Sequence, residues 1–359
     1  MNQVLTSQYY LLRNGQAPLQ WNIFDPKPRA EPELFWTQSD YCAKVLQVLE
    51  KTSEFKHLTF YITFDRLDEL PSYGKNVVVI MVGDEACRIP LYFYKVLAVF
   101  KPYGTKPFLG CNPFLNPSYI NCLSLLQFLK SWINCLPGLW NFGLNRLRLG
   151  RSYRNNLFTI PLGYYKQLEL PIKTFEARQY DIFFAGSVDN DTYIKGSLKD
   201  RITQWLKPPK TLSRKQMISN LNSLKSKHPE LNIRLSLTPG FFSTEASDSR
   251  TYSEQLMNSK ICLVPRGTSF ETYRFFEAMR YGCVVISEAL PSRWFYDKSP
   301  AVSIKNWHQL GLVVQELMEN RELMFNKHRE ALMWWRNKCS PEVTGQYIIQ
   351  KLRQLTYGL

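Results

Sequence analysis

The sequence has few of the residues that hold a metal ion in short motifs. It contains 4 histidines, and none of its cysteines forms a Cys-x-x-Cys pair. Zinc sites gather Cys and His at short, fixed spacings, so we expect no zinc site. The cysteines lie at positions 42, 87, 111, 122, 135, 262, 283 and 339. We interpret them as reduced thiols of the core.

The chain also lacks a long apolar run. A bilayer crossing takes roughly 20 consecutive apolar residues, and no stretch of the sequence provides them. The amino-terminal stretch MNQVLTSQYYLLRNGQAPLQW has no basic start followed by an apolar run, which is the pattern of a signal peptide. We therefore expect a cytoplasmic protein.

Residues 117–144 are rich in Leu, Trp and Phe, but Asn, Gln and Lys130 interrupt them. The segment permits two interpretations. The first is a pair of core helices split at Pro137. The second is an interfacial helix whose aromatic side chains enter the headgroup layer while Lys or Arg contacts anionic lipid. The second interpretation would place the protein peripherally at the inner face of a membrane.

Acidic residues are scarce relative to basic ones. Lys and Arg number 45 and Asp and Glu 30, so the net charge is +15. This charge favours an anionic partner, which can be a phosphate compound, a nucleic acid or an acidic membrane. Aromatic residues interleaved with Lys and Arg on a sheet, or a recognisable helical reader, would indicate a nucleic-acid-binding protein. We find neither and expect no nucleic acid, but a basic nucleic-acid-binding protein stays an alternative.

With 359 residues and 45% hydrophobic content, the chain suits two α/β domains better than one. Helical periodicity predicts a helix over 39–51, and buried strands are expected at 58–65, 76–82, 96–100, 181–185, 232–237, 261–264 and 283–286. Alternating strands and helices are typical of doubly wound parallel sheets. A loop with Pro161, Gly163 and Pro171 separates the halves. We expect Rossmann-like domains at 1–168 and 169–340, and a helix at 341–359 that packs back on the first domain.

The most informative segment runs from Ile261 to Trp294. Its strand ICLV leads directly into Pro265-Arg266-Gly267-Thr268-Ser269, and a helix follows. Free backbone N–H groups and the helix dipole favour an anion at such a junction. Gly267 leaves room for close approach, and Arg266 can bind two oxygens of a phosphate.

Two charged residues of the following helix are expected on a face away from the core. If Phe275, Ala278 and Met279 face the sheet, Arg274 and Glu277 can face a cleft. A guanidinium beside a diphosphate and a carboxylate beside ribose hydroxyls suit a nucleotide-sugar. The alternative is an ordinary surface pair three residues apart.

The run PRGTSFETYRFFEAMRYGCVVI, residues 265–286, resembles the exostosin family of glycosyltransferases. The matching positions are Pro265, Arg266, Gly267, Thr272, Arg274, Glu277, Gly282 and Cys283. The resemblance implies a GT-B fold, with two Rossmann-like domains facing a central cleft. It also implies inversion at the anomeric carbon and a UDP- or GDP-linked sugar donor. A similar helix occurs in bacterial fucosyltransferases, so GDP-fucose stays open.

On this interpretation the N-terminal domain binds the acceptor and the C-terminal domain binds the donor. DIFFAGS resembles the first strand of the family's donor domain. The expected donor-binding residues are Gly186, Ser187, Arg266, Gly267, Thr268, Thr272, Arg274 and Glu277. Arg266 is also expected to act in catalysis, because cationic groups stabilise a departing diphosphate.

No metal ion and no cofactor are expected, since the nucleotide-sugar is a substrate. Metal-dependent enzymes of this chemistry present paired carboxylates at a strand end. Asp189-Asn190-Asp191 is the acidic triplet of that shape. We interpret it as a polar turn that caps the next helix.

An inverting transfer needs a general base, which we expect in the first domain. Asp84 and Glu85 follow its strongest strand and are the first choice, with Asp65 and His57 as alternatives. Each can equally be a helix cap or a surface charge. The sequence therefore predicts a glycosyltransferase that acts on a glycan or lipid-linked acceptor in polysaccharide or glycoconjugate synthesis. A non-catalytic GT-B subunit that binds carbohydrate or serves as a scaffold is a further alternative.

Overall fold

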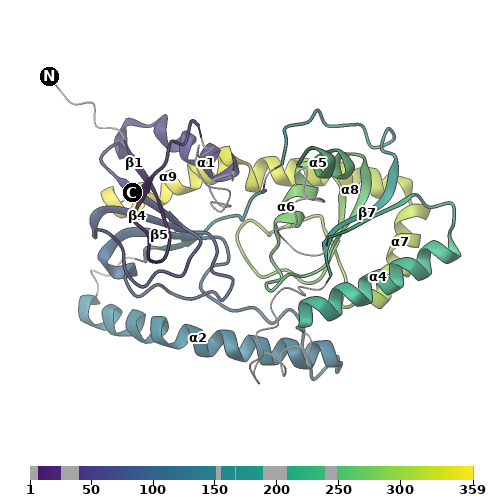
Figure 1. The fold of residues 1–359 in the computed structure, drawn as a ribbon, viewed down its shortest axis with the longest axis horizontal. Helices are drawn as coiled ribbons and strands as arrows, with labels where there is room; N and C mark the ends of the chain where they lie inside the picture. Colours follow the sequence, from purple (N-terminus) through teal and green to yellow (C-terminus); the bar gives the residue numbers. More distant parts are fainter. Residues whose placement is uncertain are drawn as a thin grey trace. The chain divides into compact units, whose positions relative to one another are not determined.

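The chain forms two compact units in a computed structural model (Figure 1). The structure describes residues 7–25, 40–150, 155–165, 167–188, 208–238 and 249–358. The first unit consists of residues 1–107, 128–166 and 338–359. The second unit consists of residues 108–127 and 167–337.

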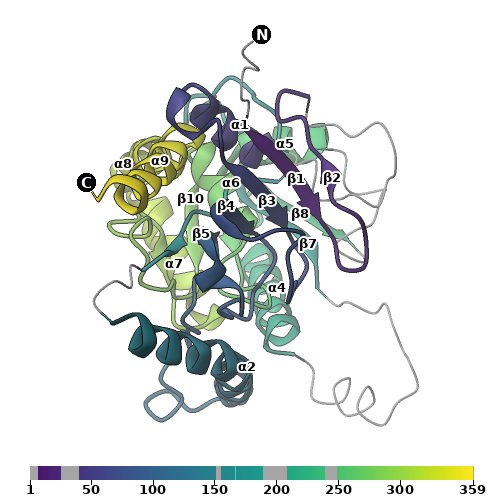
Figure 2. The ribbon, with the colours of Figure 1, turned by 90° about the vertical axis from the view of Figure 1, so that its left-hand side faces the viewer.

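The first unit is built on a six-stranded sheet with the order β2-β1-β3-β4-β5-β6. Its strands are β1 (Gln8–Leu12), β2 (Leu19–Gln20), β3 (Thr59–Thr63), β4 (Gly74–Met81), β5 (Val96–Lys101) and β6 (Leu157–Thr159). All neighbours pair in parallel except β1 and β2. Figure 2 shows β1, β3 and β4 side by side. Residues 77–80 of β4 are buried on both faces of the sheet, which is why β4 is a continuous run of β-branched residues.

The last helix of the chain belongs to the first unit. There α9 (Pro341–Tyr357) packs against α1 (Asp40–Glu50), as Figure 1 shows. Gly345 permits this contact, since a Cβ at that position would lie 2.6 Å from the Cβ of Val48. The hydroxyl of Tyr41 donates to the carbonyl of Cys339 at 2.8 Å. Short 3-10 helices, η2 (Ser53–Phe55) and η3 (Phe93–Lys95), complete the described helices of this unit.

The second unit contains a five-stranded, fully parallel sheet with the order β11-β10-β9-β7-β8. Its strands are β7 (Tyr180–Ser187), β8 (Ile233–Thr238), β9 (Ser259–Val264), β10 (Val284–Ser287) and β11 (Val302–Ser303). The helical elements are α4 (Pro209–Lys227), α5 (Ser249–Met257), α6 (Tyr273–Arg280), η5 (Trp307–Gln309), α7 (Leu310–Glu319), α8 (Arg321–Trp334) and the π-helix η6 (Trp335–Cys339). Two parallel sheets with flanking helices confirm the predicted α/β class with two Rossmann-like parts. The cleft between them stays a prediction.

The segment 117–144 differs from the first interpretation of its sequence. It forms a single helix, α2 (Tyr119–Leu149), and Pro137 lies inside it (Figure 1). Ile133 and Trp140 are 65% and 73% exposed. The pair of core helices split at Pro137 is therefore wrong. A proline removes one backbone hydrogen bond and strains the turn before it, and here the tertiary contacts of the helix outweigh that cost.

None of the helices in the described ranges has the length and hydropathy that a bilayer crossing needs.

Candidate functional site

The sheet of the second unit reverses its direction of growth next to β7. The chain adds β8 on one side of β7 and then returns to add β9 and β10 on the other. In open α/β sheets, ligands bind beyond the carboxyl ends of the strands at such a reversal. Strand β7 ends in Gly186-Ser187, and β9 leads into Pro265-Arg266-Gly267. The structure thus brings together two segments that the sequence analysis selected separately.

Gly186 allows the side chain of Arg274 to lie against the end of β7. The φ angle of Gly186 is 146°, and a Cβ at this position would lie 2.4 Å from Nη2 of Arg274. The guanidinium carbon of Arg274 lies 4.7 Å from the centre of the Phe184 ring, within the range of a cation–π contact. A side chain at position 186 would therefore displace the guanidinium.

Two buried nitrogen atoms of Arg274 have no hydrogen-bond partner among the described residues. They are Nε and Nη1. Leaving a buried donor unsatisfied costs about 1–3 kcal/mol, and more where the donor is charged. Native structures tolerate few such groups without a role for them. The geometry is therefore that of a cation prepared for an acceptor that comes from outside the chain.

Glu277 lies three residues further along α6 and is buried. Its Oε2 accepts a hydrogen bond of 2.7 Å from the hydroxyl of Tyr252. Burial raises the pKa of the Tyr252 hydroxyl well above its usual value, and the neighbouring Glu277 carboxylate raises it further. Tyr252 thus stays a neutral donor and holds the carboxylate in one orientation.

Arg266 is also buried, but its own chain occupies much of its hydrogen-bonding capacity. Nη1 donates to Ser124 Oγ at 2.7 Å, and Nη2 donates to Gln127 Oε1 at 3.2 Å. Its guanidinium carbon lies 4.0 Å from the centre of the Phe270 ring. Burial lowers the pKa of Arg266, and the nearby Glu288 opposes this. Nε has no partner among the described residues, so Arg266 is firmly positioned and has limited donor capacity left.

Two further charged residues were not expected from the sequence. Arg214 of α4 is buried, and its guanidinium donates to the carbonyl oxygens of Ser187 and Arg266, which joins the ends of β7 and β9. Glu288 directly follows β10, and its Oε2 accepts from the Arg266 amide and from Ser213 Oγ, both at 2.8 Å. The position of Glu288 after a buried strand is a signal that could have identified it. Arg214 gave no such signal, because its helix resembles a basic surface helix.

The loop between β9 and α6 offers fewer free groups than its sequence suggests. The amide of Gly267 donates to the Ser269 carbonyl at 2.8 Å, so this N–H is not available for an anion. The side chain of Thr268 is exposed, and its carbonyl accepts from Gln127 Nε2. Thr272 Oγ1 is buried and has no partner among the described residues. Of these positions, Thr272 is best suited to contact a ligand.

The same loop carries a buried carboxyl group, Glu271, paired with Arg293 at 3.3 Å. Burial raises the pKa of Glu271 to about 7, although Arg293 opposes the shift. The loop therefore contains a group that titrates near neutral pH.

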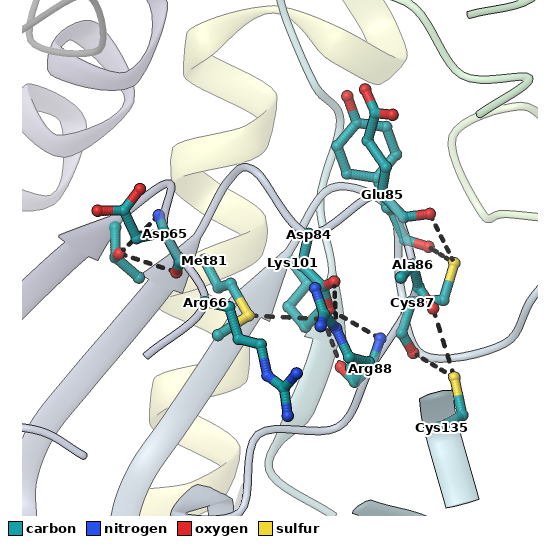
Figure 3. Close-up of polar contacts among 12 residues, drawn as sticks. Asp65, Arg66, Met81, Asp84, Glu85, Ala86, Cys87, Arg88, Lys101 and Cys135 are labelled. Carbon is teal, nitrogen blue, oxygen red and sulfur yellow. Dashed lines mark hydrogen bonds and ion pairs between the residues drawn. The ribbon is translucent and has the colours of Figure 1, made fainter. Parts of the chain in front are cut away.

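In the first unit, Asp84 follows β4 and belongs to a buried ion cluster (Figure 3). Its Oδ2 accepts from Lys101 Nζ at 2.6 Å and from the Arg88 amide at 2.7 Å, and its Oδ1 accepts from Arg88 Nε at 3.0 Å. Burial alone would raise the pKa of Asp84, but Lys101 and Arg88 hold it below its usual range. Burial lowers the pKa of Lys101 in turn, while Asp84 opposes this. Both Asp84 oxygens are thus occupied by the protein.

Glu85 differs from Asp84 in being exposed. Figure 3 shows its side chain pointing away from Lys101. Of the two alternative bases, Asp65 accepts a hydrogen bond from the Asn14 amide at 2.9 Å, and His57 is exposed. The identity of the base stays a prediction.

Within the described ranges, no three His, Cys, Asp or Glu side chains gather in a way that could hold a metal ion. The triplet Asp189-Asn190-Asp191 lies outside these ranges. The expectation of a metal-independent site stays a prediction.

Residues 151–292 match the family model of the Exostosin GT47 domain. The match confirms the resemblance to the exostosin family for this segment. The exostosin GT47 segment includes β7 to β10 and every predicted donor-binding residue.

Two relatives extend the similarity at low coverage. The chain is 36% identical over 69 residues to the Exostosin-1 homolog of Caenorhabditis elegans, which covers 19% of this chain and 17% of the relative. It is 26% identical over 143 residues to ribitol-5-phosphate xylosyltransferase 1 of Danio rerio, which covers 36% of this chain and 33% of the relative. The chain thus matches a third or less of the length of each relative.

Solved structures resemble the chain only distantly. The GtfA/B complex is 11% identical, with 79% of this chain and 58% of that chain covered and a TM-score of 0.40. An alpha-glucosyltransferase in complex with UDP-glucose and DNA is 10% identical, with 88% and 84% covered and a TM-score of 0.38. The fold assignment above rests on the chain's own two sheets.

Proposed function

We propose that the protein is a glycosyltransferase that binds a UDP- or GDP-linked sugar in its second unit. The observation that carries the proposal is the pair of unsatisfied N–H groups of Arg274, placed by Gly186 at the reversal of the sheet. A diphosphate would supply the acceptors that these groups lack. The match of residues 151–292 to the exostosin GT47 domain supports the same interpretation.

The other residues of this site take separate roles in the proposal. Glu277, held by Tyr252, accepts hydrogen bonds from ribose hydroxyls. Thr272 contributes its unpaired hydroxyl. Ser187 and Gly267 shape the backbone, Thr268 lies at the exposed rim, and Arg266 stabilises the negative charge that develops on the leaving diphosphate.

The chemical step that we propose is a single displacement with inversion and without a metal ion. Glu85 takes the proton from the acceptor hydroxyl, and the oxygen attacks the anomeric carbon on the face opposite the diphosphate. The bond from that carbon to the diphosphate oxygen breaks, and the UDP or GDP leaves with the bonding electrons. Glu85 is preferred to Asp84 because the Asp84 oxygens already accept from Lys101 and Arg88. Asp84 then positions the turn that carries Glu85.

A glycan or lipid-linked molecule is the acceptor in this proposal, and the predicted cleft between the units is where transfer would occur. We also propose a reducing, cytoplasmic location. All eight cysteines lie in described ranges and none forms a disulfide, which supports a reducing compartment.

A thermal-shift screen with UDP-, GDP- and CMP-sugars tests the proposal. We expect a rise in the unfolding temperature with one UDP- or GDP-sugar, unchanged by EDTA. A ligand that binds only the folded state adds about 2.7 kcal/mol at a hundred times its dissociation constant. No shift with any nucleotide-sugar would contradict the proposal, and a shift abolished by EDTA would contradict its metal-free part. Binding without transfer to any glycan would favour the non-catalytic subunit.

A further inference from the structure

Helix α2 carries a row of exposed apolar side chains on the side that faces away from its own unit. Within the first unit these residues recur every three or four positions, which places them on one helix face. They are Leu129, Ile133, Leu136, Trp140, Leu144 and Leu147, and we call them the apolar row. At 1.5 Å per residue the row is about 27 Å long. Single exposed apolar side chains are common, but a contiguous row marks an interaction surface.

The opposite face of α2 is fixed to the first unit. Cys135 is fully buried, and its thiol lies 3.4 Å from the carbonyl of Cys87. Gly138 allows the helix to approach closely, since a Cβ there would lie 2.4 Å from the Ile89 carbonyl oxygen. The Phe142 ring packs on Phe93 with 5.5 Å between the ring centres. These contacts determine which face of α2 is turned outward, so the exposure of the apolar row is a property of the fold.

The charges of α2 are all positive. The helix contains Lys130, Arg146 and Arg148 and no Asp or Glu. All three cations are exposed, and Lys130 and Arg148 directly follow the two ends of the apolar row. Apolar side chains with Trp among them, flanked by Lys and Arg, are the features of helices that lie in the interface of an anionic membrane.

We propose that the apolar row of α2 binds the surface of an anionic membrane, with the helix lying in the plane of the interface. Charge complementarity selects this partner over a second copy of the chain. A second copy would bring another net charge of +15 and, at α2, no carboxylate to pair with Lys130 or Arg148. An anionic bilayer attracts each basic residue by about 1 kcal/mol. The proposal does not depend on the sugar-transfer chemistry, although membrane binding would bring the active site near a lipid-linked acceptor.

Co-sedimentation with vesicles tests this proposal. We expect the wild type to bind vesicles of phosphatidylcholine mixed with phosphatidylglycerol and to bind vesicles of phosphatidylcholine alone more weakly. The double variant Ile133→Ser/Trp140→Ser should bind the anionic vesicles at least about tenfold more weakly, because both side chains would otherwise leave water. The matched control is Leu312→Ser/Met333→Ser, which removes apolar side chains that are 74% and 51% exposed on α7 and α8. The control should bind like the wild type.

A second pair of substitutions separates the charge from the apolar contact. Lys130→Gln/Arg148→Gln should remove most of the preference for anionic over neutral vesicles. Equal sedimentation of the wild type and the Ile133→Ser/Trp140→Ser variant would overturn the proposal, as would absence of binding by the wild type. A wild-type dimer in analytical ultracentrifugation that becomes a monomer in this variant would also overturn it, because the apolar row would then be a self-association surface. Donor-induced thermal shifts should be the same for all these variants, so failure here is distinguishable from failure of the proposed function.

Discussion

Both units place charged side chains beyond the ends of buried parallel strands, but they treat these charges differently. In the first unit, Asp84 binds Lys101 and Arg88 through both carboxylate oxygens. In the second unit, Arg274 has two buried nitrogen atoms without a partner among the described residues. A buried ion is costly unless it is paired. The first arrangement therefore serves the fold, and the second is suited to a ligand that completes it.

Sheet topology agrees with this contrast. The strands of the first unit from β1 onward follow one another in a single direction across the sheet, in the order β1-β3-β4-β5-β6. The described part of that sheet has no reversal after β1. In the second unit the reversal lies beside β7, and a reversal is where open sheets bind ligands. A charge at a strand end is thus informative about function only together with its partners and its place in the strand order.

The largest expected effect comes from unpairing the closed cluster. Lys101→Met leaves the Asp84 carboxylate buried with Arg88 alone, and removing one partner of a buried pair costs about 3–5 kcal/mol. We expect this loss in the urea unfolding transition of the first unit. Lys95→Met, at an exposed position, should change the transition by less than about 0.5 kcal/mol. If Lys101→Met behaved like Lys95→Met, the cluster would not be a stabilising element of the fold.

The next largest effect separates the two neighbouring carboxylates. Glu85→Gln should lower kcat about a hundredfold, the lower limit for loss of a general base, and leave the donor dissociation constant unchanged. Release of UDP or GDP in the presence of a glycan acceptor measures the rate. Asp65→Asn and His57→Gln are the parallel variants. A full rate in Glu85→Gln together with a loss in either of the others would transfer the role of base to that residue.

A third prediction concerns the open arrangement. Arg274→Ala should weaken donor binding about thirtyfold, or about 2 kcal/mol, because it removes charge-assisted hydrogen bonds to the diphosphate. Without donor, the unfolding temperature should not fall, since the removed nitrogen atoms had no partner to lose. Arg250→Ala is the control, because its side chain is exposed on α5 of the same unit. Calorimetric titration measures the first effect and thermal unfolding the second. A variant that unfolds earlier yet binds donor like the wild type would make Arg274 a structural residue.

The sequence was sufficient where one short segment determines the local structure. β4 and β9 were predicted because each is a continuous apolar run that ends at Gly or Pro. The pairing of Gly186 with Arg274 could only be expected as a shared cleft, since the contact joins residues far apart in the chain. The course of α2 was not predictable, because Cys135 and Gly138 fix the helix through contacts that outweigh Pro137.

Charged residues show the same limit. The predicted strand of the first unit ended at Phe100, because Lys101 resembles a polar strand end. In the structure Lys101 is buried and continues β5. A lysine can occupy such a position only if a carboxylate reaches it. That carboxylate, on Asp84, comes from a different strand end, and nothing in the local sequence announces the pairing.

The smallest expected effect tests whether the second unit is open at a neutral group as well as at a cation. Thr272 Oγ1 is buried without a partner among the described residues, and Thr272→Val replaces this hydroxyl by a methyl group of similar shape. A buried hydroxyl that bonds nothing contributes no stability, so the unfolding temperature without donor should stay the same or rise slightly. Donor binding should weaken about fivefold, or about 1 kcal/mol, if the hydroxyl bonds the donor. Calorimetric titration of Thr272→Val beside Thr272→Ser distinguishes the cases, because serine keeps the hydroxyl. Equal donor affinity in all three proteins would restrict the ligand-seeking groups of the second unit to its arginines.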